Sequence, residues 1–235
     1  MLSVVDLLDA GTVDLDMAAY LAAAVSGGRS LLTGAVPGGA GKTAVMVALL
    51  NFLPPDVPIV PAESSRVVRA GLRPDAPVAC YLCHEIGSGG YYAYLWGKDA
   101  RDYFSLTRND HTIATNLHAD TWSQAHDQLC HTNGVDEADF RRVGLMAFIA
   151  FADPGWRRQR RVAAVWESDG RTAHRMIWRW DRERDAYEQT ADALIAPAQV
   201  EPFRGLIERL KRDGMRTIEA VRRSVVEFLD SGLSG

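Results

Sequence analysis

The chain has 235 residues, of which 47% are hydrophobic and 24% are charged, and its net charge is −4. This is an ordinary globular composition, enough for one large domain or for one domain with an appendage. The lack of an overall basic field argues against direct nucleic-acid binding. No apolar run reaches the roughly 18 residues that cross a bilayer, so we expect a cytoplasmic protein that meets the inner face of a membrane only through a partner.

The first predicted elements lead to a glycine-rich loop. Residues 1–29 form a linker in which Asp16 is predicted to cap a helix over 17–25. A short apolar strand over 30–34 follows, and an apolar helix over 44–53 comes after the loop. The loop itself is Val36-Pro37-Gly38-Gly39-Ala40-Gly41-Lys42-Thr43. A strand, a glycine-rich loop and a helix in this order are the context of a phosphate-binding loop.

The residue types of this loop suit a bound phosphate chain. Glycines let backbone N–H groups turn inward around an anion, and the helix N-terminus adds about half a positive charge. Lys42 would reach the outer phosphates of ATP, and the Thr43 hydroxyl would hold Mg²⁺. Val36 stands where the general pattern has glycine, and a glycine-rich turn without a ligand is the alternative. The predicted nucleotide-binding residues are Gly38, Gly39, Ala40, Gly41, Lys42, Thr43 and Ala44.

Acidic residues follow two further predicted strands. Glu63 comes after the short strand 58–62, and Glu85 comes after the apolar run 77–83. Ligands bind at the carboxyl ends of strands in an open α/β sheet. An acidic residue there can hold Mg²⁺ through water or activate the attacking water. Both are therefore candidate catalytic residues, and a solvated loop carboxylate is the alternative for Glu63.

The middle of the chain alternates strands and helices. The aromatic segment 91–96 is predicted to be a strand or a packed loop, with its rings in a core or interface rather than stacked on a base. The other elements up to residue 153 are helices over 98–107, 121–131 and 136–143 and strands over 111–117 and 145–151.

The three cysteines argue against a disulfide framework. Cys80, Cys83 and His84, together with Cys130 and His131, could be drawn as a zinc site. Residues 80 and 83 of one strand point to opposite faces, however, and buried free thiols are common. We therefore favour buried thiols.

After residue 153 the pattern changes. A hairpin is predicted over 157–167 and 173–181, followed by amphipathic helices over 198–212 and 216–230. The run Arg157–Arg161 is interpreted as charged edge positions that discourage strand pairing rather than as a nucleic-acid site. The predicted segments are a linker (1–29), a nucleotide-binding core (30–153) and a C-terminal hairpin with a helical subdomain (154–235).

The sequence resembles the ATPase domain of the type II/IV secretion motors, above all the archaeal branch that drives pili and archaella. Residues 6–65 are similar to the family's segment from the domain linker through the Walker A loop to the Asp box. Residues 100–121 are similar to the segment that ends in the His box, and residues 160–189 to the hairpin that follows. The resemblance covers nearly the whole ATPase domain, and we expect that domain only.

This resemblance implies an α/β P-loop fold of the RecA-like type, with a mostly parallel central sheet plus the C-terminal hairpin and two helices. Glu63 matches the acidic residue of the Asp box, which helps to place water or Mg²⁺. His118 matches the His box, which senses the γ-phosphate, and His111 matches a histidine one turn earlier. Members of the family work as hexameric rings that convert ATP hydrolysis into domain rotation and move a membrane-embedded platform.

The sequence departs from the family pattern in two places. Most of the segment between the Asp box and Walker B, which carries arginines that reach a neighbouring subunit, is missing, and Arg66 and Arg69 are its candidate remnants. The Walker B glutamate also has two candidate positions. A gapless alignment from His111 places it at Tyr94, whereas an inserted loop places it at Glu85, which we favour because an apolar run precedes it.

The predicted function is an ATPase that couples Mg-ATP hydrolysis to mechanical work in a ring. The alternative is a degenerate member that binds nucleotide, hydrolyses little or none of it, and acts as a regulatory or structural subunit. A P-loop kinase of a small molecule is a third reading, and the match of His118-Ala119-Asp120 to the family speaks against it.

Overall fold

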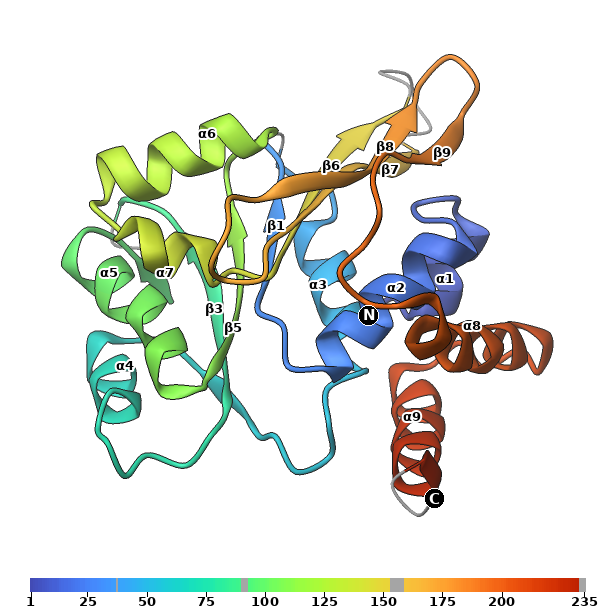
Figure 1. Cartoon of the computed structure of the whole chain (residues 1–235), viewed down its shortest axis with the longest axis horizontal. Coiled ribbons are helices and arrows are strands. Elements are labelled where there is room, and N and C mark those ends of the chain that lie inside the picture. The colour runs from blue at the N-terminus through green and yellow to red at the C-terminus, as the bar shows by residue number, and fades with distance from the viewer. Residues whose placement is uncertain (37, 90–92, 153–158, 233–235) are drawn as a thin grey trace.

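A mixed β-sheet forms the centre of the computed structural model, which describes residues 1–36, 38–89, 93–152 and 159–232 (Figure 1). Its strand order is β2-β3-β5-β1-β6-β7-β8-β9, with β4 paired to β3. The strands through β6 pair in parallel, and β7 to β9 are antiparallel. The strands are β1 (Leu31–Gly34), β2 (Ile59–Pro61), β3 (Cys80–Ile86), β4 (Tyr94–Leu95), β5 (Thr112–Leu117), β6 (Leu145–Phe151), β7 (Arg160–Glu167), β8 (Arg175–Asp181) and β9 (Ala186–Gln189).

Helices cover both faces of the sheet, as Figure 1 shows. One face packs against α1 (Val4–Asp9), α2 (Leu15–Ser26), α3 (Lys42–Leu50), α8 (Pro197–Arg212) and α9 (Ile218–Gly232). The other face packs against α4 (Ser65–Gly71), α5 (Lys98–Ser105), α6 (Trp122–His126) and α7 (Glu137–Arg141). Side chains of β6 alternate between these two cores: Leu145, Ala147 and Ile149 enter the first, whereas Met146 and Phe148 enter the second.

The N-terminal helices differ from the prediction. Asp14, not Asp16, caps α2, because its Oδ1 atom accepts a hydrogen bond from Met17 N at 2.8 Å. Asp16 lies inside the first turn instead. The prediction also missed α1, which begins with a capping box in which Ser3 and Asp6 satisfy each other's backbone N–H groups. That Ser-x-x-Asp spacing was the available signal.

The strand predicted over 77–83 is shifted along the chain. β3 begins at Cys80, which pairs with Ile59 of β2 and Thr112 of β5. Pairing with the neighbouring strands therefore sets the first residue of β3, and the strand continues through Glu85 to Ile86. Cys80 faces the core under α3 and Cys83 faces the core under α5, so the prediction of buried thiols on opposite faces is confirmed.

The predicted helix over 121–131 is confirmed at its start but changes its winding. The Thr121 hydroxyl accepts a hydrogen bond from Gln124 N and caps α6. After His126 the chain continues as a π-helical segment, η2 (Asp127–Thr132). A π turn holds one residue more than an α turn, and six residues are too few for apolar periodicity to distinguish the two. Similarly, α5 passes into the 3₁₀ segment η1 (Leu106–Asn109).

The C-terminal region is part of the same sheet. The predicted hairpin corresponds to β7 and β8, and a further strand, β9, was not predicted. Residues 153–158, including Arg157 and Arg158, lie outside the described residues. Because β7 pairs with β6, the sheet continues across the predicted boundary at residues 153/154, and the division into segments stays a prediction. None of the helices in the described ranges is long and apolar enough to cross a bilayer.

A buried carboxylate joins the hairpin to α2. Glu167 at the end of β7 is fully buried, and its Oε1 atom accepts hydrogen bonds from Arg175 Nη2 at 3.1 Å and Leu194 N at 2.9 Å. Its Oε2 atom accepts a short hydrogen bond from the Tyr20 hydroxyl. Burial, and then this hydrogen bond, raise the pKa of Tyr20. Glu167 thus links three segments that are far apart in sequence.

Replacing Glu167 with alanine is expected to lower the free energy of unfolding by about 1–3 kcal/mol, because it leaves the buried Tyr20 hydroxyl without its acceptor. The matched control is Glu188→Ala, which removes the partner of Arg179 and Arg184 at the surface. That change should cost less than about 1 kcal/mol. Urea denaturation of both variants measures the difference, and equal costs would contradict the assignment.

Candidate functional site

The glycine-rich loop joins the end of β1 to the start of α3. Gly34 ends β1 where a Cβ atom would lie 2.5 Å from Ala119 O, so the close approach of the loop after β5 requires glycine. Gly41 precedes α3 with a φ of 95°, a conformation that favours glycine. The first backbone N–H groups of α3 have no partner within the helix and point toward this loop. A helix N-terminus of this kind can bind an anion, and the assignment of the loop to phosphate stays a prediction.

Lys42 is the first residue of α3, and its ammonium group is held at the base of the loop. Its Nζ atom donates to Ala35 O at 3.1 Å and lies 3.0 Å from Glu85 Oε1. The Lys42 residue is 9% exposed. A buried ammonium with a carboxylate partner sits where the outer phosphates of a nucleotide were predicted to bind.

Glu85 lies at the carboxyl end of β3, 5% exposed, with three polar side chains around it. Besides Lys42, its Oε1 atom lies 3.1 Å from His118 Nε2. Its Oε2 atom is 3.5 Å from the Tyr94 hydroxyl. Although it is within ion-pair distance of two groups, Oε1 accepts no hydrogen bond from the described residues. Of the two positions left open for the Walker B glutamate, the structure brings Glu85 to the loop, and Tyr94 contacts it.

The end of β5 contacts the loop at two points. His118 Nδ1 lies 3.3 Å from Val36 O. Asp120 Oδ1 accepts a hydrogen bond from Val36 N at 2.7 Å. His118 therefore bridges the loop and Glu85, which is a suitable position for a group that responds to the outer phosphate. His111 lies elsewhere: it is buried at the start of β5, where its ring hydrogen-bonds to Ala79 N and Gly71 O.

Sequence reasoning missed Asn116, which organises the floor of the site. It is 1% exposed, and its amide donates to Thr43 Oγ1 at 3.1 Å and to His84 O at 2.7 Å. Its Oδ1 atom accepts a hydrogen bond from the Thr33 hydroxyl at 2.5 Å. A buried asparagine in a central strand is disfavoured, and that was the signal available in the sequence.

In Asn116→Ala, the factor by which Mg²⁺ raises the affinity for ATP is expected to fall about tenfold, because the Thr43 hydroxyl loses the donor that orients it. Titration of ATP with and without Mg²⁺ measures this effect. The control is Asn51→Ala, another buried asparagine whose amide donates to Val47 O within α3. An equal effect of Mg²⁺ on affinity in both variants would count against the role of Asn116.

Arg160 also reaches the loop, from the start of β7. Its Nη2 and Nε atoms donate to Gly39 O at 3.0 and 3.3 Å. Its Cδ atom lies 2.9 Å from the position of a Cβ on Gly41. The interpretation of this arginine run as edge positions is wrong for Arg160, because β7 lies between β6 and β8. Nothing in the sequence distinguishes this arginine from its neighbours.

Glu63 is placed farther from the loop than Glu85. It is exposed in the connection between β2 and α4. β2 is separated from β1 by β3 and β5, a distance of about 14 Å across the sheet. Arg66 and Arg69 are exposed on α4, where Arg69 Nη2 donates to Ser65 Oγ at 3.1 Å. The structure therefore groups Lys42 with Glu85 rather than with Glu63.

The cysteines of the zinc alternative are not brought together. Cys80 and Cys83 lie on opposite faces of β3, and burial raises the pKa of the Cys83 thiol to about 11. Cys130 lies on η2, a different element. The proposed set of Cys80, Cys83 and Cys130 is thus wrong as a single site.

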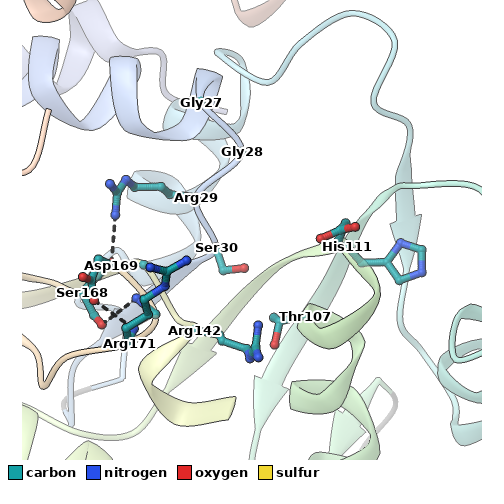
Figure 2. A pocket seen from close by; sticks show the side chains of 13 residues that line it. Gly27, Gly28, Arg29, Ser30, Thr107, His111, Arg142, Ser168, Asp169 and Arg171 are labelled. Carbon is teal, nitrogen blue, oxygen red and sulfur yellow. Dashed lines mark hydrogen bonds between the residues drawn. The ribbon is translucent and has the colours of Figure 1, made fainter. Parts of the chain in front are cut away.

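A polar cavity of about 620 Å³ lies at the opposite edge of the sheet (Figure 2). Arg29, Arg142 and Arg171 line it, and Arg29 Nη1 donates to Ser168 O at 2.8 Å. Arg29 precedes β1, whereas Lys42 follows it, and the four residues of β1 span about 13 Å. This cavity is therefore separate from the glycine-rich loop.

The mostly parallel sheet with a glycine-rich loop after β1 defines an α/β P-loop fold of the RecA-like type, so the predicted fold class is confirmed. Within that class, the chain is similar to the VirB11 ATPase of the Brucella suis type IV secretion system, solved in complex with sulphate. The TM-score is 0.50 and the identity 17%, over 70% of this chain and 54% of that chain. The chain thus shares the fold of that protein over the matched region and spans about half of its length. No protein-family model and no curated protein matches the sequence.

Proposed function

We propose that this chain binds Mg-ATP through residues 38–44 and hydrolyses it, with Glu85 as the general base. The observation that carries this proposal is the contact of Glu85 with both Lys42 and His118, at 3.0 and 3.1 Å. A phosphate-binding cation, a carboxylate and a second nitrogen group meet at one point beside the glycine-rich loop. Phosphoryl transfer needs such positioning and charge stabilisation more than covalent chemistry.

The residues present fit a triphosphate. A Cβ on Gly38 or Gly39 would meet no atom within 4 Å, so the backbone there is open to a ligand. Lys42 has its ammonium beside this opening, 3.0 Å from the buried Glu85 Oε1 atom. Lys42 would therefore exchange its contact with Glu85 for a phosphate oxygen. Glu85 would then be free to accept a proton from water.

Thr43 is the residue that would hold Mg²⁺, which when bound neutralises and polarises the phosphate oxygens. Its Oγ1 atom accepts a hydrogen bond from Asn116. That contact uses one lone pair and leaves the other for a ligand on the exposed side of α3. Asn116 thus acts as a positioning residue beneath the metal position.

Arg160 is a further candidate for contact with phosphate. Its guanidinium donates a hydrogen bond to the neutral carbonyl Gly39 O. A hydrogen bond to a phosphate oxygen would be stronger, because both groups are then charged. Arg160→Ala is expected to lower ATP affinity about tenfold or more. Calorimetry measures this, with Arg179→Ala on β8 as the control, since Arg179 pairs with Glu188 at the surface. Unchanged affinity in Arg160→Ala would remove Arg160 from the site.

The alternative is a degenerate member that binds nucleotide but hydrolyses little or none. The direct ion pair between Lys42 and Glu85 favours it if the pair persists when nucleotide is bound, because the ammonium group makes the carboxylate a weaker base. Calorimetry with Mg-ATP and a phosphate-release assay on the same sample separate the two. Binding with turnover supports the ATPase, and binding without turnover supports the alternative. Absence of binding would exclude both.

We also propose that the chain works as a hexameric ring in a secretion or pilus system and meets a membrane platform through a partner. This proposal rests on the resemblance to secretion motors and on the VirB11-like fold. Sedimentation of the 25.8 kDa chain with Mg-ATP tests the first part. A hexamer is expected, and a monomer at all concentrations would contradict it.

A further inference from the structure

Three side chains with different donor atoms converge between α6 and α7, away from the loop. His126 is the last residue of α6, Cys130 lies on η2, and Glu137 is the first residue of α7. One donor atom from each, a ring nitrogen, the sulfur and a carboxylate oxygen, lie within 4.8 Å of one another. Nitrogen, sulfur and oxygen donors at such spacing can reach one ion with small side-chain rotations.

A short contact joins two of these side chains. His126 Nε2 lies 2.6 Å from Glu137 Oε1. Cys130 is half-buried beside them, and its sulfur lies within 4.8 Å of the donor atoms of both. A carboxylate that already contacts an imidazole, with a sulfur next to it, forms an arrangement in which a divalent cation can replace protons.

The surroundings hold the ligands in place. Trp122 stacks on the His126 ring with a centroid distance of 5.2 Å and an angle of 20°, and Phe140 packs edge-on against the same ring at 5.1 Å. The π-helical winding of η2 sets the position of Cys130, and such segments are frequent at functional sites. His126 and Cys130 are only partly exposed. A neutral imidazole, a thiolate and a carboxylate would together neutralise the charge of a divalent ion.

We propose that His126, Cys130 and Glu137 form a Zn²⁺ site with three protein ligands and an open fourth position. Mixed nitrogen, sulfur and oxygen donors suit zinc better than Mg²⁺ or Ca²⁺, which prefer oxygen ligands. The bound ion would tie α6 and η2 to α7. α6 begins four residues after His118, so the ion would fix the segment that follows the end of β5.

Cobalt substitution tests the site, because a thiolate bound to Co²⁺ gives a charge-transfer absorption band that other ligands do not. The full chain is expected to show this band with Co²⁺ and to lose it on addition of Zn²⁺. Cys130→Ser should abolish the band. Glu137→Gln should weaken Zn²⁺ affinity at least about tenfold, measured by competition with a chromophoric chelator. The Glu137 side chain is 52% exposed, so this variant is expected to fold.

Two controls make the test specific. His131→Ala should keep the band: its ring lies edge-on to His126 at 5.1 Å, but its nitrogens are not among the clustered donor atoms, and its Nδ1 atom pairs with Asp127. Lys42→Ala should also keep it, so failure of the ATP proposal would not affect this one. No band in the parent chain, or a band that survives Cys130→Ser, would overturn the zinc site. A band lost in His131→Ala but kept in Glu137→Gln would also overturn it.

Discussion

Replacing Lys42 with alanine is expected to lower the affinity for Mg-ATP by about 10- to 100-fold. The ammonium group is the charged donor nearest the open backbone of Gly38 and Gly39, and hydrogen bonds to charged groups contribute about 1.5–3 kcal/mol. Isothermal titration calorimetry with ATP and Mg²⁺ measures the change. The rest of the loop remains, so weak binding by main-chain N–H groups should persist.

A folding check and a control variant are needed to interpret this change in affinity. Lys42→Ala leaves the buried Glu85 carboxylate without its ammonium partner, so urea denaturation must show that the variant is folded. Lys98→Ala is the matched control, because Lys98 pairs with Asp102 on the exposed face of α5. Its affinity for Mg-ATP should equal that of the parent chain. If the parent releases no heat with Mg-ATP, or if Lys42→Ala binds as the parent does, the phosphate-binding role is wrong.

Glu85→Gln is expected to reduce ATP turnover by about 10²- to 10⁴-fold, the range typical of losing a general base. Glutamine preserves the shape and the contact with Tyr94 but accepts no proton from water. ATP affinity should stay within a few-fold of that of the parent chain, or rise. In the variant, Lys42 no longer has to break an ion pair with residue 85 in order to bind phosphate. A phosphate-release assay under saturating ATP measures the loss.

Glu63→Gln is the control that separates the two candidate carboxylates. Glu63 lies at an exposed position three strands from β1, so its variant should keep most of the turnover. If Glu63→Gln loses activity and Glu85→Gln keeps it, the assignment of the base is reversed. Such a reversal would mean that β2 and the loop approach each other in the working state. If the parent shows no turnover, the degenerate alternative stands.

The contacts at the end of β5 suggest how a ligand bound at the loop would change the structure elsewhere in the chain. Asn116 contacts Thr43, His118 contacts Glu85 and Val36, and Asp120 holds Val36 N. Displacement of Lys42 or Glu85 by a ligand would therefore change contacts at the end of one strand. α6 follows that strand directly, and the proposed zinc ligands begin at its last residue. A bound ion there would make α6, η2 and α7 respond together.

The sequence alone determined the features that depend on local pattern. A strand, glycines and a helix opening on Lys42 predicted the phosphate-binding loop, since these residues are contiguous and their chemistry is local. Apolar periodicity likewise predicted most strands and the two C-terminal helices. The local pattern did not predict features that depend on tertiary contacts. Pairing with β2 and β5 sets the start of β3, and the π-helical winding of η2 occurs where that segment packs against the rest of the chain.

Only the tertiary structure decided which distant side chains meet. Lys42, Glu85 and His118 come from three parts of the chain, and the strand order β3-β5-β1 brings Lys42 and His118 within 3.1 Å of the Glu85 carboxylate. The sequence marks Asn116 only as a strand residue and Arg160 only as one of several arginines. In the fold, Asn116 contacts Thr43 and Arg160 contacts Gly39. Side-chain contacts across a sheet depend on strand order and register, which no local pattern encodes. The sequence therefore specified the chemistry available, and the packing of the sheet selected the residues that share one site.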